Sequence, residues 1–60
     1  MRAYSLNELF HLTRNELFEL HAKIVRQLAD MPEDSAKQMV AYENLRLIRR
    51  VLARYVVVPH

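Results

Sequence analysis

Cysteine and glycine are both absent from this chain of 60 residues, proline occurs only twice, and no apolar run is long. Without cysteine the chain has no disulfide and no thiolate metal site, and its three scattered histidines do not form a ligand cluster. Without glycine it has no glycine-rich loop to hold a phosphate. A membrane span needs about 20 apolar residues, and no signal-peptide core follows Met1, so we expect a cytoplasmic protein.

The small size of the chain sets the next constraint. Sixty residues form one domain over 1–60, and a chain of this length buries only about 60% of its unfolded surface. Because disulfides and metals are excluded, oligomerisation is the remaining means of stabilisation. Ser5, Thr13 and Ser35 occupy cap or turn positions, and the three histidines, His11, His21 and His60, are far apart in helical phase. We expect neither an enzyme nor a cofactor, metal or small-molecule substrate.

Two capping boxes predict where the first helices begin. Ser5 and Thr13 are each followed three residues later by glutamate, at Glu8 and Glu16. Pro32 fits only a loop or a first helical turn, so the chain reverses there, and a third helix follows. The expected helices are 6–11, 14–29 and 33–55, and 56–60 is expected to be an extended apolar tail.

Apolar residues occupy about half of the circumference of both long helices. This is wider than the stripe of about 100° that a two-helix contact covers. The sequence therefore predicts an all-α fold, an antiparallel helical hairpin with a short N-terminal helix, in which apolar surface is left over and the chain self-associates into a helical bundle. The expected self-association surface consists of Phe18, Val25, Val40, Leu47, Val51 and Tyr55.

Two polar residues interrupt these apolar halves. If the helices fold about Pro32, facing residue numbers sum to about 65, which sets His21 opposite Asn44. The two side chains would then satisfy each other, or a symmetry mate, and set the alignment of the helices. Partial exposure at the end of an interface and a pH-sensitive role for the histidine remain open alternatives.

The third helix carries the only charge asymmetry, in the set Arg46, Arg49, Arg50 and Arg54. Like charges four residues apart repel each other unless an anion or carboxylate lies beside them. The candidate partners are acids of the same protein, namely Glu8, Glu16 or Glu19, plain solvation, an acidic partner protein and a phosphate backbone. The net charge is only +2, and no aromatic residue alternates with the arginines in sequence, which disfavours a dedicated nucleic-acid binder.

Three segments, 5–9, 12–17 and 44–54, resemble those of a group of short uncharacterised bacterial proteins of comparable length. The resemblance covers most of the chain and implies no activity. The layout of a capped start, a long helix and a late basic segment is also similar to the small helical-hairpin protein of the large ribosomal subunit. That protein is much more basic, so this likeness implies shape alone.

The expected function is a small non-enzymatic interaction or regulatory module that acts as a homodimer, with another protein as a second possible partner. The alternative is a nucleic-acid-associated protein that binds phosphates through the arginines of the third helix.

Overall fold

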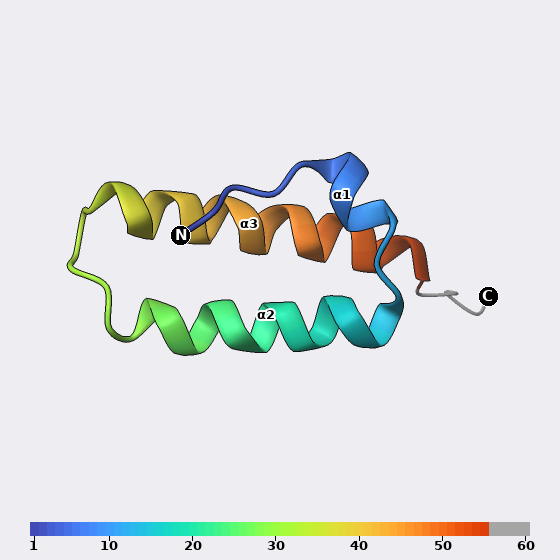
Figure 1. The fold of residues 1–60 in the computed structure, drawn as a ribbon, viewed down its shortest axis with the longest axis horizontal. Coiled ribbons are helices and arrows are strands. Elements are labelled where there is room, and N and C mark those ends of the chain that lie inside the picture. The colour runs from blue at the N-terminus through green and yellow to red at the C-terminus, as the bar shows by residue number, and fades with distance from the viewer. Residues whose placement is uncertain (56–60) are drawn as a thin grey trace.

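A computed structural model describes residues 1–55, which form helices and turns without any strand. The elements are α1 (Leu6–Phe10), α2 (Arg14–Leu28), α3 (Ala36–Leu52) and the 3₁₀ turn η1 (Ala53–Tyr55). The two long helices lie alongside each other and run in opposite directions, and α1 packs against α3 (Figure 1). The all-helical class predicted from the sequence is confirmed. The expected extended tail, 56–60, lies outside the described residues.

The first two helices begin at the capping boxes that the sequence predicts. The hydroxyl of Ser5 accepts from the Glu8 backbone N–H at 3.2 Å, and that of Thr13 accepts from the Glu16 N–H at 3.1 Å. Each glutamate accepts in return from the backbone N–H of its cap residue. Because each cap satisfies amides that have no intrahelical partner, two helix starts fit close together, and a turn at residues 11–13 separates them.

The third helix begins three residues later than expected, at Ala36 instead of position 33. Ser35 is its N-cap, and the Ser35 hydroxyl accepts from the Gln38 N–H at 3.1 Å. Asp34 has a left-handed φ of 58°, which breaks the helical path before this cap. The backbone N–H of Asp34 donates to the Gln38 side chain at 2.8 Å. The helix also ends at Leu52, and η1 occupies the remaining positions to 55.

The core is small and draws on all three helices. A core of this size is consistent with the marginal stability of a 60-residue chain. Its fully or almost fully buried apolar residues are Leu9, Leu17, Ile24, Ala41, Leu45, Ile48 and Val51.

No helix formed by residues 1–55 combines the length and apolarity needed to span a bilayer.

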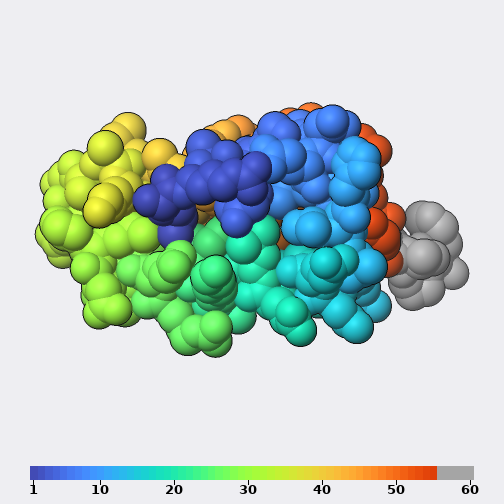
Figure 2. Space-filling view, in the orientation of Figure 1, coloured from blue at the N-terminus to red at the C-terminus, as the bar shows by residue number. Residues whose placement is uncertain are grey.

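The N-terminal arm, defined here as residues 1–5, is fastened to α3 by one buried side chain. The Tyr4 backbone N–H donates to Asn44 Oδ1 at 3.0 Å, and Asn44 Nδ2 donates to the Arg2 carbonyl at 2.8 Å. Arg2 also pairs with Glu8 and stacks over the Tyr4 ring. In Figure 2 the dark-blue arm covers the line along which α2 and α3 meet. The arm therefore shields one face of this helix pair.

Candidate interaction surface

One side of α2 points away from the core and carries apolar residues. The outer α2 face is defined here as Phe18, Ala22, Val25 and Ala29, all of them exposed. Phe18 is 49% and Val25 47% exposed. At 100° per residue these four positions lie 100–160° around the helix from Ile24, which is buried in the core. Phe18 and Val25 are the large apolar side chains of α2 that are exposed among residues 1–55.

The six residues expected to form a self-association surface do not lie together. Phe18 and Val25 are exposed on the outer α2 face, whereas Val40 and Leu47 of α3 are half-buried. Val51 is fully buried, so its expected place on an exposed surface is wrong. Leu9 of α1 belongs to the same core cluster as Val51, and the packing of α1 against α3 accounts for this burial.

Tyr55, the sixth expected surface residue, lies in η1 at the end of the described chain. Its side chain is 43% exposed. Its hydroxyl donates to the Leu12 carbonyl at 3.4 Å, which ties η1 to the turn between α1 and α2. Tyr55 therefore contacts the turn between α1 and α2 and is not part of the outer α2 face.

The expected polar pair of His21 and Asn44 does not form. Asn44 is buried as expected, at 1% exposure, but both hydrogen bonds of its side chain go to the backbone of Arg2 and Tyr4. His21 is half-buried, and no hydrogen bond joins it to Asn44 within residues 1–55. The backbone of the N-terminal arm supplies the hydrogen-bond partners of Asn44 that were expected from His21 on the facing helix. No buried side-chain nitrogen or oxygen in the described part of the chain lacks a partner.

Two of the four arginines on α3 and η1 have partners on their own helix. Arg46 Nε donates to Glu43 Oε2 at 3.0 Å, and this ion pair lowers the pKa of the Glu43 carboxyl and raises that of Arg46. Arg49 Nε donates to the Leu45 carbonyl at 3.4 Å. Glu43, a carboxylate of α3 itself, thus relieves part of the like-charge repulsion, in place of Glu8, Glu16 or Glu19, which the sequence suggested.

The other two arginines, Arg50 and Arg54, are exposed. The Arg54 guanidinium lies over the Phe10 ring, 4.7 Å from its centroid. Arg14 lies in the same way over Phe18, at 5.4 Å. Sequence reasoning missed the first contact because it joins residues 44 positions apart. The second, at a spacing of four residues within α2, was detectable from the sequence.

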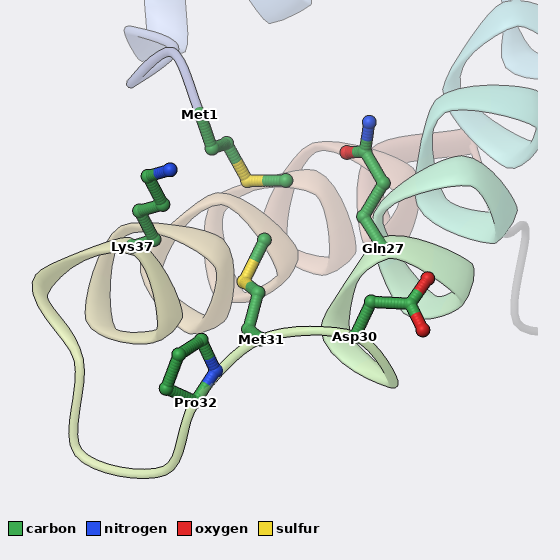
Figure 3. A pocket seen from close by; sticks show the side chains of 6 residues that line it. All are labelled: Met1, Gln27, Asp30, Met31, Pro32 and Lys37. Atoms are coloured by element: carbon green, nitrogen blue, oxygen red, sulfur yellow. The ribbon is translucent and has the colours of Figure 1, made fainter.

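A shallow pocket of about 300 Å³ lies between the N-terminal arm and the turn that precedes α3. Figure 3 shows the side chains of Met1 and Met31 pointing toward each other there. The other lining residues are Gln27, Asp30, Pro32 and Lys37. Nowhere in residues 1–55 do three histidine, aspartate or glutamate side chains gather to hold a metal ion. The pocket combines two thioethers with one carboxylate and one ammonium group.

Comparison with known proteins identifies no relative: no protein-family model, curated protein or solved structure matches this chain.

Proposed function

We propose that this chain is a small non-enzymatic interaction module that acts as a homo-oligomer and associates through the outer α2 face. The observation that carries the proposal is the exposure of about half of Phe18 and of Val25, two turns apart on one side of α2. Phe18 and Val25 lie on the same side of one helix and are not scattered over the surface, which favours a binding surface.

The exposed apolar area determines how tight this association can be. Burying the exposed half of Phe18 or Val25 contributes about 1 kcal/mol each, and a symmetric dimer buries two of each, or about 4 kcal/mol. The loss of translational and rotational freedom on association costs about 4 kcal/mol or more. The two terms nearly cancel, so these two side chains alone supply almost no net affinity. A Kd of 1 mM corresponds to about −4 kcal/mol, and this amount must come from the rest of the contact, so we expect a weak dimer.

Sedimentation equilibrium over a concentration series up to about 1 mM tests this proposal. The wild-type chain should show a monomer–dimer equilibrium, and the double variant Phe18→Ala, Val25→Ala should shift it toward the monomer. The matched control is Met39→Ala, Tyr42→Ala, which removes two exposed apolar side chains from α3 instead. A wild-type monomer at every concentration would contradict the proposal, as would an equal loss of association in the control.

Phosphate binding is the second candidate function, supported by the exposure of Arg50 and Arg54 and by the Phe10 ring beside Arg54. Arginine beside an exposed aromatic ring is a combination found in proteins that bind single-stranded nucleic acids.

Fluorescence anisotropy with a labelled single-stranded oligonucleotide at about 50 mM salt tests this second candidate. The variant Arg50→Gln, Arg54→Gln should weaken binding and reduce its salt dependence. The variant Lys23→Gln, Lys37→Gln removes the same charge elsewhere and should bind like the wild type. Absence of binding, or equal losses in both variants, would exclude this function.

A further inference from the structure

The outer α2 face is bordered on one side by two opposite charges. Going around the helix at 100° per residue, Val25, Phe18, Ala29 and Ala22 are followed by Asn15, then by the charged residues Arg26 and Glu19. Both charged side chains are exposed, and neither forms an ion pair within residues 1–55. The apolar stripe therefore has a charged edge whose two members are seven residues, or two turns, apart.

The order of these residues along α2 favours one orientation for a second copy. Ala22 lies midway between Phe18 and Arg26, so an antiparallel α2 packed about Ala22 brings together positions whose numbers sum to about 44. Glu19 then lies beside Arg26 of the partner subunit, and Phe18 lies beside the partner's Val25. In a parallel pairing Glu19 would lie beside the same residue of the partner and Arg26 likewise, and like charges would repel. Ala22 is small enough to allow the two helices to approach closely.

We propose that a second copy of this chain packs antiparallel on the outer α2 face, with Ala22 near the two-fold axis and Glu19 paired with Arg26 of the partner subunit. The inference rests on the proposed function and adds to it the orientation of the partner. An isologous contact of this kind repeats every interaction twice, so two identical ion pairs flank the apolar centre. The pairing closes after two copies and leaves no free outer α2 face.

Single thiols introduced into this cysteine-free chain test the position of the axis. A disulfide requires that the Cα atoms of its two cysteines lie about 4.4–6.8 Å apart. With the two-fold axis at Ala22, the two Cα atoms of position 22 in the dimer lie within this range, so Ala22→Cys can form a disulfide with its own copy. The matched control, Ala29→Cys, lies on the same face but about 21 Å from its own copy, at 1.5 Å per residue. Under oxidised glutathione, the Ala22→Cys chain should form a covalent dimer at least tenfold faster than the Ala29→Cys chain. Equal rates would overturn the antiparallel orientation.

Charge exchange tests the ion pairs themselves. In sedimentation equilibrium at low salt, Glu19→Arg and Arg26→Glu should each raise the dissociation constant about tenfold, because two attractive pairs become two repulsive ones. The double variant Glu19→Arg, Arg26→Glu restores opposite charges across the axis and should recover the wild-type constant to within about threefold. Lys37→Glu makes the same charge change as Arg26→Glu but at the start of α3, and it should leave the constant unchanged.

The outcomes separate the inference from the proposed function. A wild-type chain that stays monomeric overturns both. A wild-type dimer that neither single charge variant weakens overturns the Glu19–Arg26 pairing, while self-association through the outer α2 face stands. A double variant that stays as weak as the single variants overturns the antiparallel register. Circular dichroism of each variant shows that its helices are intact.

Discussion

Replacement of Asn44 by leucine should release the N-terminal arm and destabilise the protein. The Asn44 amide makes two hydrogen bonds of 2.8 and 3.0 Å to the backbone of the arm. Each such bond contributes about 1 kcal/mol net, so their loss should lower the free energy of unfolding by about 2 kcal/mol. For a domain of this size that corresponds to a drop in Tm of roughly 10 °C. Leucine has the same branched shape as asparagine and a larger volume, so the substitution leaves no cavity.

Urea denaturation at a fixed protein concentration measures this change, and the fixed concentration keeps any contribution of self-association constant. The matched control is Asn7→Leu, which makes the same substitution at an exposed site of α1 and should change stability by less than about 0.5 kcal/mol. Trypsin offers a second readout, because release of the arm should speed cleavage after Arg2. An Asn44→Leu protein that is as stable as the wild type, with Arg2 still protected, would refute the assigned role.

Two further predictions concern packing and the caps. Val51→Ala should lower the free energy of unfolding by about 2 kcal/mol because it leaves a cavity in the core. Val25→Ala, at an exposed site, should change it by less than about 0.5 kcal/mol. Urea denaturation distinguishes the two variants, and equal losses would contradict the assigned burial. Hydrogen bonds from Thr13 lower the pKa of the Glu16 carboxyl, so the stability that this ionised cap contributes is present above the ordinary carboxylate pKa and is lost as the pH falls through the lowered value. Far-ultraviolet circular dichroism during an acid titration should therefore show a smaller loss of helix for Glu16→Gln than for the wild type, and identical curves would exclude this contribution.

The local features of the fold could be predicted from the sequence because the interactions that set them span only a few residues. The capping boxes at Ser5 and Thr13 join residues three apart, and the apolar period of each long helix is a property of one segment. The late start of α3 was predictable in part, since Ser35 is a recognisable cap. The acidic residues just before Ser35 favoured an earlier start at position 33, and the left-handed φ of Asp34 excludes that start.

The candidate surface depended on interactions that no single helix reveals. The helical period showed which half of α2 and of α3 is apolar. Because each apolar half is too wide for one helix contact, only the packing of α1 and the N-terminal arm decided which part of it stays exposed. Val51 is buried for that reason, whereas Val25 remains exposed. The partners of Asn44 lie 40 and 42 residues away in the chain. The sequence by itself thus determined the helices and their apolar sides, and the tertiary structure alone decided which apolar side remains open to a partner, because burial depends on what packs against a face.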